Sequence, residues 1–336
     1  MASCGGTTAP VSPSAAASVA ASKPAASAAA SAAAKAVAAP PSIVIATQPG
    51  IGYAPLIVMQ EEHWLEQAMP NTKFEYKQLT SGSAIRDGMI AGQIQIGSGG
   101  VAPFLVGWDK GVKWRLMSSM NNMPLWLNVI DPNIKDLKAF QGHAEMKIAM
   151  PAPDSIQAVV LMKASKDRLG NAQALQTNVV AMAHPLGAQS LLSKQIAGHL
   201  TSPPFQEQEV EKGAHTIVNS YDVFGETTFN SVFVTEDFHD KFPEAYNTLV
   251  QTFDRALKLV QDDPKQAAEL MSKNEQGKET VEELVKAMQA QGIKYTNVPT
   301  GFGKFASFMK EVGLVSKEPS SWKDLVFPNL AVVNGS

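Results

Sequence analysis

The residues that could do chemistry in this sequence lie in short polar loops. The segment Ser81-Gly82-Ser83 stands directly before an expected helix, and the segment Ser98-Gly99-Gly100 follows a short apolar stretch. Hydroxyl side chains and a glycine at a helix start leave backbone N–H groups unpaired, and such groups attract anions. Glycines after a strand let the backbone come close to a bound molecule. These residue types favour non-covalent binding of a small ligand; the alternative is that both segments are only tight turns between strands and helices.

Both segments belong to one unit of the sequence, Thr80 to Phe104, which has a second copy. The second copy runs from Met182 to Phe205, and an offset of 102 residues aligns Met89 with Leu191. Each copy contains a polar turn, a short helix and a strand. A unit of this kind that occurs twice predicts two similar lobes, with the matched turns at a cleft.

Other loops also carry polar or aromatic residues that could contact a ligand. A glycine-rich turn from Gln48 to Pro55 contains Tyr53, whose ring could stack on a ligand, and Asn122 lies beyond an expected strand. Asp154 or Ser155 can cap the helix that follows them. An Asp cap uses the N–H groups that an anion would need and adds a repelling charge. This second helix start is therefore expected to be the weaker anion site.

Several side chains allow more than one interpretation. His184 stands where a cleft histidine could contact a polar ligand, but a turn histidine bonded to the backbone fits equally well. Trp126 could line the cleft, although a tryptophan at this point more often packs in a core. His199 is expected in a strand, with its ring bonded locally. Arg86 and Asp87 are expected on a solvated helix face.

No motif for catalysis or for a metal site is present. The sequence lacks a G-x-S-x-G elbow, a P-loop and a G-x-G-x-x-G segment, and no second metal ligand stands at suitable spacing from His184 or His199. A net charge of −3 without a Lys/Arg-rich run gives no support to nucleic-acid binding. No apolar segment reaches the roughly 18 to 20 residues of a transmembrane helix. We therefore expect a binding protein without a cofactor, a metal or a catalytic residue.

The N-terminal residues have a different composition from the rest. The only cysteine, Cys4, follows small residues and looks like the lipidated cysteine at the end of a bacterial lipoprotein signal. The alternative is an incidental cysteine in a flexible tail. Residues 5–42 are almost entirely Ala, Ser, Pro, Thr and Gly, which cannot bury enough apolar surface to fold. Residues 1–42 are thus expected to be a lipoprotein-type disordered tether.

The elements that must position the polar loops alternate between strands and helices. We expect strands at 42–47, 74–78, 114–118, 147–150, 178–181, 195–200 and 215–219, with helices at 55–69, 103–110 and 186–194 among them. This order predicts mostly parallel sheets with right-handed crossovers. Strands 125–130 and 228–234 are expected to cross between lobes, and the chain after 235 is expected to be helical. The predicted boundaries are 43–128 and 233–336 for lobe I and 129–232 for lobe II.

Four segments occur in an order and spacing that carry a family resemblance. They are Gln48 to Tyr53, Ala91 to Gly97, Ile134 to Lys138 and Gly198 to Phe205. With them, residues 43–330 resemble the substrate-binding proteins of bacterial ABC importers, most closely the nitrate/sulfonate/taurine and thiamine-precursor branch. The resemblance implies the two-lobed periplasmic-binding-protein type 2 fold, in which each lobe is a mostly parallel sheet flanked by helices. Two hinge crossings would let the lobes close on a small ligand.

The resemblance also implies which loops contact the ligand. The implied contacts are Gln48, Ile51, Gly52, Tyr53, Thr80, Ser81, Gly82, Ser83, Ser98, Gly99, Gly100, Asn122, Asp154, Ser155, His184, Thr201 and Ser202. The sequence departs from the anion binders of this branch, which commonly carry Gly-Ser where this chain has Asp154-Ser155. No Arg or Lys falls in these loops, so a strong charge clamp for an anion is not expected.

The function that the resemblance implies is solute capture for import. An extracytoplasmic, lipid-anchored monomer would bind a small polar or anionic organic solute, either sulfonate-, taurine- or nitrate-like or pyrimidine-like. It would deliver that solute to an ABC permease and its ATPase by hinge closure. Two alternatives share the fold. One is an enzyme like the thiamine-pyrimidine synthase, whose cysteine-rich motif is absent here. The other is an effector-sensing domain, whose helix-turn-helix is replaced here by the tether.

Overall fold

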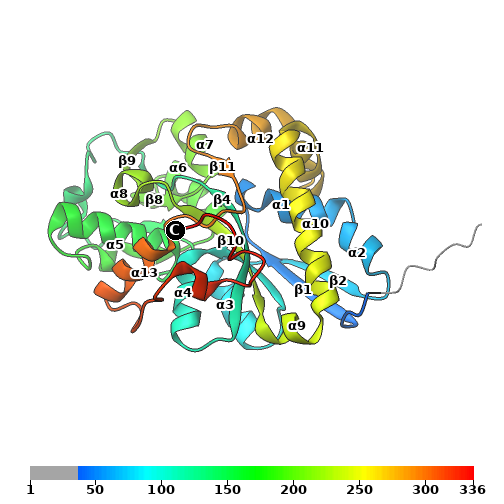
Figure 1. The fold of residues 1–336 in the computed structure, drawn as a ribbon. Coiled ribbons are helices and arrows are strands. Elements are labelled where there is room, and N and C mark those ends of the chain that lie inside the picture. Colours follow the sequence, from blue (N-terminus) through cyan, green and yellow to red (C-terminus); the bar gives the residue numbers. More distant parts are fainter. Residues whose placement is uncertain (1–36) are drawn as a thin grey trace, which may run out of the picture. The chain divides into compact units, whose positions relative to one another are not determined.

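Two β-sheets organise residues 37–336, the part of the chain that the computed structural model describes. We call the parts of the chain built on them lobe I and lobe II (Figure 1). The sheet of lobe I contains β1 (Ser42–Thr47), β2 (Lys73–Gln78), β3 (Ile96–Gly100), β4 (Trp114–Asn122), β10 (Thr228–Thr235) and β11 (Lys294–Tyr295). The sheet of lobe II contains β5 (Trp126–Val129), β6 (Ile148–Met150), β7 (Val179–Ala181), β8 (Gly198–Thr201) and β9 (His215–Asn219).

The two sheets have the same strand order. In lobe I the order β4-β10-β3-β1-β2 corresponds to β9-β5-β8-β6-β7 in lobe II. In each sheet one strand, β1 or β6, is parallel to both of its neighbours, and the next two pairings are antiparallel. The repeated unit of the sequence forms α3 (Gly82–Ile90) with β3 in lobe I and α6 (His184–Leu192) with β8 in lobe II. The predicted two-lobed α/β fold is therefore confirmed. The prediction of mostly parallel sheets needs correction, because β5 and β10 run antiparallel to their neighbours and make both sheets mixed.

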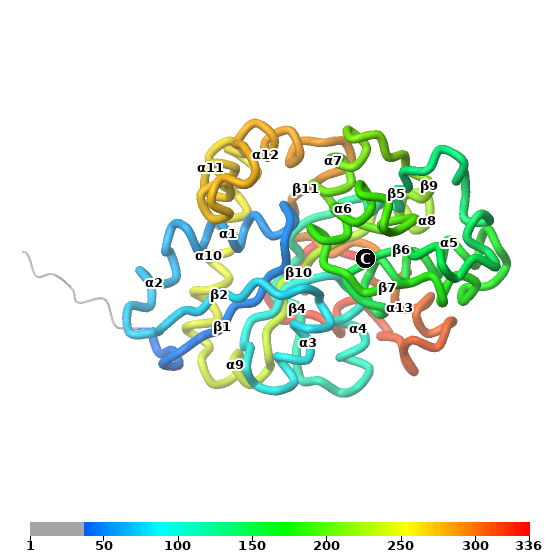
Figure 2. Tube along the Cα trace, turned by 180° about the vertical axis from the view of Figure 1, so that it is seen from behind, coloured from blue at the N-terminus to red at the C-terminus, as the bar shows by residue number. Residues whose placement is uncertain are grey.

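Helices cover both faces of the lobe I sheet. Figures 1 and 2 show α1, α10 and α11 together on one side of β1 and β2, with α3 and α4 on the other side. Helix α10 buries Leu249, Phe253 and Leu257, which lie four residues apart and form one apolar stripe. The helices of this lobe besides α3 are α1 (Ala54–Glu61), α2 (Trp64–Ala68), α4 (Val101–Asp109), α9 (Glu236–Lys241), α10 (Pro243–Asp262), α11 (Pro264–Asn274), α12 (Val281–Met288) and α13 (Phe302–Glu311).

The helices of lobe II are α5 (Ile156–Leu169), α6, α7 (Phe205–Glu211) and α8 (Ser220–Phe224). Helix α5 begins where the Ser155 hydroxyl accepts a hydrogen bond from Ala158 N, and it ends at Gly170, whose φ of 76° is left-handed. Short 3₁₀ helices complete both lobes: η1 (Ile51–Tyr53), η2 (Leu137–Phe140), η3 (Gln176–Asn178) and η4 (Trp322–Leu325).

The glycine segment after Ile96 is a strand, which corrects the prediction of a turn there. Gly97, Ser98 and Gly99 are part of β3, which pairs with β1 and β10 at the centre of the sheet. A Cβ atom at Gly97 would lie 2.4 Å from Met89 Sδ and 2.5 Å from the Phe233 ring. The glycines are needed because side chains of neighbouring elements cross this strand closely.

Several predicted element and lobe bounds also need correction. The helix expected at 55–69 is broken into α1 and α2 at His63, whose φ of 54° is left-handed. The expected tether ends before residue 42, because the Pro40 and Pro41 carbonyls accept hydrogen bonds from the Thr72 hydroxyl and from Lys73 N, respectively. The lobe boundaries predicted at 128/129 and 232/233 fall inside β5 and β10, so the pairing of these strands places the crossings a few residues earlier. Cys4 lies outside the described residues.

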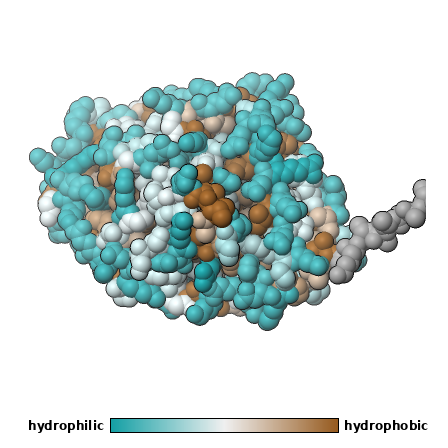
Figure 3. Space-filling view, in the orientation of Figure 1, coloured by the Kyte–Doolittle hydropathy of each residue, from teal (hydrophilic) through white to brown (hydrophobic). Residues whose placement is uncertain are grey.

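Hydrophilic residues cover most of the surface, and large hydrophobic side chains pack in the core. Figure 3 shows hydrophobic residues on this face as small separate patches among hydrophilic ones. In the core of lobe I, the rings of Phe104, Trp114 and Phe233 pack with centroids 5.1 to 5.7 Å apart. Within residues 37–336, the helices are too short or too polar to cross a membrane.

Candidate functional site

A small cavity lies between the lobes at the place where the predicted loops converge. The cavity volume is about 20 Å³, which is room for about one water molecule. The predicted residues that line it are Gln48, Tyr53, Gly82, Gly100, Ser155, His184 and Ser202. Pro49 and Ile156, which adjoin predicted residues in the same loops, also line it, and the wall is completed by residues that were not predicted, namely Pro103, Gln157, Phe229 and Asn230. In this conformation the lobes are therefore nearly closed on each other at the predicted site.

The other predicted site residues do not line this cavity. The Ser98 hydroxyl donates to Ala46 O at 2.6 Å, and the Asn122 side-chain amide donates to Glu226 Oε1 at 2.7 Å. Ile51 is fully buried, and its carbonyl accepts a hydrogen bond from the Tyr295 hydroxyl. The residues in this group are Ile51, Gly52, Thr80, Ser81, Ser83, Ser98, Gly99, Asn122, Asp154 and Thr201. Ser98, Asn122 and Ile51 hold their segments of the chain by these bonds, and Ser83 and Asp154 join the lobes.

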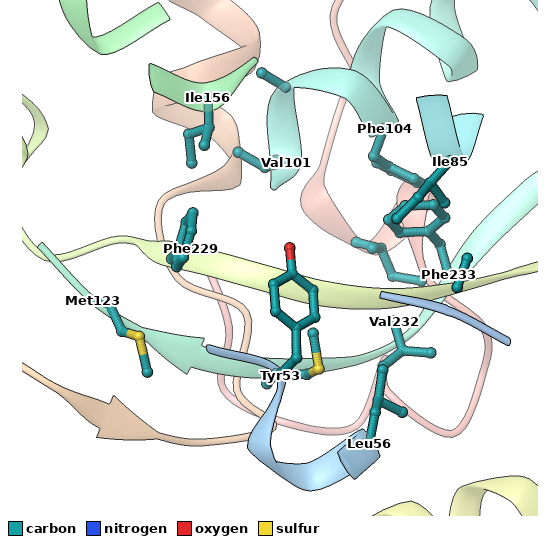
Figure 4. Packing of buried hydrophobic residues seen from close by; sticks show 14 of the residues in the cluster. Tyr53, Leu56, Ile85, Val101, Phe104, Met123, Ile156, Phe229, Val232 and Phe233 are labelled. Atoms are coloured by element: carbon teal, nitrogen blue, oxygen red, sulfur yellow. The ribbon is translucent and has the colours of Figure 1, made fainter. Parts of the chain in front are cut away.

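The lobe I wall is built around the Tyr53 hydroxyl. Gln48 Nε2 donates to Tyr53 Oη at 2.6 Å, and Tyr53 Oη donates to Asn230 Oδ1 at 3.3 Å. Burial raises the pKa of Tyr53 above its usual range, so the phenol stays protonated. Figure 4 shows the Tyr53 hydroxyl pointing toward the side where Val101 and Ile156 lie. The ring is buried in this conformation, and its predicted stacking on a ligand stays a prediction.

Asp154 joins lobe II to lobe I beside the small cavity. Its Oδ1 accepts a hydrogen bond from the Ser83 hydroxyl, and its Oδ2 accepts one from Arg86 Nη1 at 2.5 Å. Burial alone would raise the pKa of Asp154, but the bonds from Ser83 and Arg86 hold it below its usual range. The Arg86 side chain is only 10% exposed, whereas that of Asp87 is 66% exposed. The prediction of a solvated face is therefore wrong for Arg86, because lobe II covers it.

On the lobe II side of the small cavity, three buried titratable side chains are in contact one after another: His184, His199 and Glu209. His184 Nδ1 lies 3.3 Å from His199 Nε2 and 3.0 Å from the Thr201 hydroxyl, and its Nε2 lies 3.2 Å from the Gln157 amide. His199 Nδ1 lies 2.5 Å from Glu209 Oε1. His184 lines the small cavity, and its ring nitrogens have side-chain partners rather than backbone ones; its contact with a polar ligand stays a prediction. His199 lies in β8 with both ring nitrogens bonded locally, as predicted.

Burial keeps these three linked side chains, His184, His199 and Glu209, uncharged. It lowers the pKa of His199 to about 3 and lowers that of His184 well below its usual value, to which the nearby His199 also contributes. It raises the pKa of Glu209 to about 8, although Asn128 donates a hydrogen bond to Glu209 Oε2 at 2.9 Å. At neutral pH the Glu209 acid therefore donates its proton to His199 Nδ1. His184 presents a neutral imidazole to the cavity.

A second, larger cavity of about 810 Å³ lies between the lobes next to the first, and Pro49 lines both. Lobe I contributes α1, β2 and the segment from Asn274 to Ala290; lobe II contributes β5 and α7. Trp126 lines this cavity, which favours its cleft interpretation over the core. Little in the sequence marked the rest of this wall, because the glutamates of α7 and α12 resemble those of ordinary solvated helices.

The described residues contain no group of three or more His, Cys, Asp or Glu side chains that could hold a metal ion. What the arrangement can do chemically is form hydrogen bonds and charge contacts with a molecule held between the lobes. Residues from both lobes line each cavity, so a bound molecule would touch both.

Comparisons with known proteins agree with this architecture. The sequence model of the NMT1-like family matches residues 36–273, which is more than half of the chain. No curated protein matches the chain. Several solved structures share its fold. One is the alkanesulfonate-binding protein SsuA from Xanthomonas axonopodis pv. citri bound to MOPS, with a TM-score of 0.70 and 14% identity over 84% of this chain and 96% of that one.

Two further structures are similar to a comparable degree. The periplasmic nitrate-binding protein NrtA from Synechocystis PCC 6803 has a TM-score of 0.69 and 15% identity, over 85% of this chain and 84% of that one. The ligand-binding component of an ABC-type import system from Staphylococcus aureus, with zinc bound, has a TM-score of 0.67 and 18% identity, over 86% of this chain and 97% of that one.

Proposed function

Because the chain belongs to the NMT1-like family, we propose that it is the solute-binding component of an ABC importer and captures a small polar organic solute between its lobes. The observation that carries the proposal is the pairing of predicted loops across the interlobe cavity, Gln48 and Tyr53 facing Ser155, His184 and Ser202. The names of the similar structures, which are binding proteins for sulfonate and nitrate and an importer component, support it.

The mechanism would be closure of the lobes on the solute. A solute that bonds to both lobes stabilises the closed state relative to the open one, and a permease that recognises the closed state then receives only loaded protein. The Asp154 contacts with Ser83 and Arg86 cross between the lobes and would form on closure. Population shift between the two states couples capture to delivery.

Binding without catalysis is the activity that the site chemistry supports. A general base needs a pKa near the working pH, and burial holds the His184 pKa well below that. The Thr201 hydroxyl beside it is fully buried and cannot reach a substrate. The small cavity accordingly offers hydrogen bonds rather than a nucleophile.

Two finer parts of the proposal concern location and partners. We expect the protein to act outside the cytoplasm as a monomer, held at the membrane by a lipid on Cys4, and to pass its solute to a permease with an ATPase. Mass spectrometry of the protein purified from bacterial membranes would detect the lipid on Cys4. Protein that carries an unmodified Cys4 in the membrane fraction would contradict the anchor but not the binding function.

Thermal melting of the full chain tests the solute-binding function. The panel would contain nitrate, taurine, alkyl and aryl sulfonates, carboxylates, aminopyrimidines and organic amines. A solute at 100 times its Kd adds about 2.7 kcal/mol to the stability of the folded state, which is a clear rise in melting temperature. Small-angle scattering with and without the solute would then show whether the lobes close. A chain that no member of such a panel stabilises would speak against the proposal.

A further inference from the structure

The larger interlobe cavity has a charge and a lining that point to one class of solute. This inference rests on the proposed function and names the solute for it. We propose that the larger cavity binds an organic cation, an ammonium group on an aromatic or apolar body, and that glutamates of its wall hold the charge, among them Glu207 of lobe II and Glu279 of lobe I.

The size of the cavity fits such a molecule. Its volume of about 810 Å³ lies within the range of roughly 300 to 1,000 Å³ that is usual for sites of organic ligands. The small cavity, at about 20 Å³, has no room for an organic solute in the same conformation. The larger cavity is thus the place between the lobes where a solute fits without further opening.

Aromatic and apolar side chains form part of the wall. Trp126 and Phe205 come from lobe II, and Tyr76 and Ile57 come from lobe I. Trp126 is the best of these rings for a cation, since an ammonium group over an indole face is attracted by the ring quadrupole. The same surfaces bury the apolar body of the solute.

The carboxylates of the wall outnumber its cations. The wall contains five glutamates, which are Glu207, Glu211, Glu275, Glu279 and Glu283, and three lysines, which are Lys212, Lys278 and Lys286. In the described part of the chain, Lys286 pairs with Glu211 at 2.5 Å, whereas neither Glu207 nor Glu279 forms an ion pair. Glu207 accepts a hydrogen bond from Gln206 at 3.0 Å, and Glu279 accepts one from Gln208. Two half-buried carboxylates therefore lie in the walls of one cavity without a cationic partner among residues 37–336.

The surroundings of these two carboxylates favour a positive ligand. Burial raises the pKa of Glu207, and the charges of Glu209 and Glu211 add to this; burial also raises the pKa of Glu279, with Glu275 and Glu283 adding to it. A cation placed among them would relieve this repulsion. One oxygen of Glu207, Oε2, is buried without a hydrogen-bond partner among the described residues, so the hydrogen bonding of the Glu207 carboxylate is incomplete.

Three probes with the same hydrocarbon part test the charge of the solute. They are 2-phenylethylammonium, 2-phenylethanol and 2-phenylethanesulfonate, measured by isothermal titration calorimetry on the full chain at millimolar concentration and neutral pH. We expect the ammonium probe to bind at least roughly tenfold more tightly than the alcohol, and the sulfonate to bind most weakly.

Variants of the two carboxylates identify the site. Glu207→Gln and Glu279→Gln should each weaken binding of the ammonium probe roughly tenfold and leave binding of the alcohol unchanged. Trp126→Leu should weaken the ammonium and the alcohol together. Glu282→Gln is the matched control, because Glu282 is exposed on the same helix as Glu283 and does not line the cavity. Circular dichroism would check that each variant folds.

The outcomes separate this inference from the proposed function. Tighter binding of the sulfonate, or equal loss of affinity in Glu282→Gln and Glu207→Gln, would overturn the cation site and leave solute capture intact. Failure of all three probes to bind would also overturn it. In that case the broader melting panel, which contains solutes of other classes, would decide the function separately.

Discussion

The Glu209→Gln substitution should change how the stability of the protein depends on pH. Glu209 is fully buried, its carboxyl lies 2.5 Å from His199 Nδ1, and burial raises its pKa to about 8. A glutamine has the shape of the protonated acid, so its amide can donate to His199 and accept from Asn128 in the same places. The variant therefore keeps the hydrogen bonds of the neutral acid and removes its titration.

The sign follows from the two states of the chain. In the unfolded chain Glu209 has its ordinary pKa near 4.5, so the folded state binds one more proton between pH 4.5 and about 8. Its stabilising contribution is complete below pH 4.5 and is lost as the pH rises through this window, at about 1.4 kcal/mol for each pH unit. From pH 6.5 to pH 8 the loss is about 2 kcal/mol. The Glu209→Gln variant should not lose this amount.

The two histidines act in the opposite direction and at lower pH. Burial lowers the pKa of both His184 and His199, so the unfolded chain binds protons that the folded chain does not as the pH falls below 6.5. Their contribution to stability is therefore lost on acidification, in both the parent chain and the variant. Above pH 6.5 the difference between the two proteins should report Glu209 alone.

Urea unfolding at several pH values between 5.5 and 8.5 measures the effect. The free energy of unfolding of Glu209→Gln minus that of the parent should rise by about 2 kcal/mol between pH 6.5 and pH 8. Glu282→Gln, which removes an exposed carboxylate, should give a difference that stays flat over this range. A Glu209→Gln variant that is less stable by a constant amount at every pH would refute the reasoning, because Glu209 would then be an ionised partner of His199.

Two other substitutions test the closure contacts and the glycine strand. Arg86→Met should weaken the closed state by about 2 kcal/mol, or roughly 30-fold in the ratio of closed to open molecules, which scattering or a fluorescence pair across the lobes would detect. Lys77→Met removes a half-buried cation that pairs with Glu75 inside lobe I, so it should have no effect on closure, and an equal effect of both substitutions would contradict the role of Arg86. Gly97→Ala should lower the free energy of unfolding by about 1 to 3 kcal/mol, because the new Cβ would lie 2.4 Å from Met89 Sδ. Gly303→Ala, where a Cβ meets no atom within 4 Å, is the control, and equal unfolding midpoints for the two alanine variants would count against this packing argument.

The fold was predictable from local patterns because each lobe repeats the same elements. The Ser81 cap on α3 follows from a hydroxyl residue before a helix, and Ala84 N does donate to Ser81 Oγ at 3.1 Å. The strand of the first copy was expected to end before Gly97, because glycines after an alternating segment usually mark a turn, whereas β3 continues to Gly100. The close packing of Met89 and Phe233 on Gly97 explains why this strand needs a glycine, and Phe233 comes from a distant part of the sequence.

The site was predictable in part, for the same reason. Gln48, Tyr53, Ser155 and Ser202 line the small cavity because loops at matching ends of two similar sheets meet. Arg86 could not be placed, since its partner Asp154 is 68 residues away and comes from the other lobe. In α7, Gln206 and Glu209 are fully buried although they are polar. No hydrophobic pattern marks that buried face. The sequence therefore did not predict the contact of the two histidines with Glu209, or the glutamates in the wall of the larger cavity.

The two cavities together indicate that the charge of the solute and closure of the lobes depend on the same residues. At the small cavity, the Asp154 carboxylate lies beside the first turn of α3, the place where the sequence favoured an anion, and a ligand anion there would meet its charge. At the larger cavity, Glu279 accepts a hydrogen bond from Gln208 across the lobes while its own charge has no cationic partner among the described residues. A cation bound there would stabilise the ionised carboxylate of Glu279, which also accepts the hydrogen bond from the other lobe. Binding and closure would then favour each other, which is the coupling that solute delivery requires.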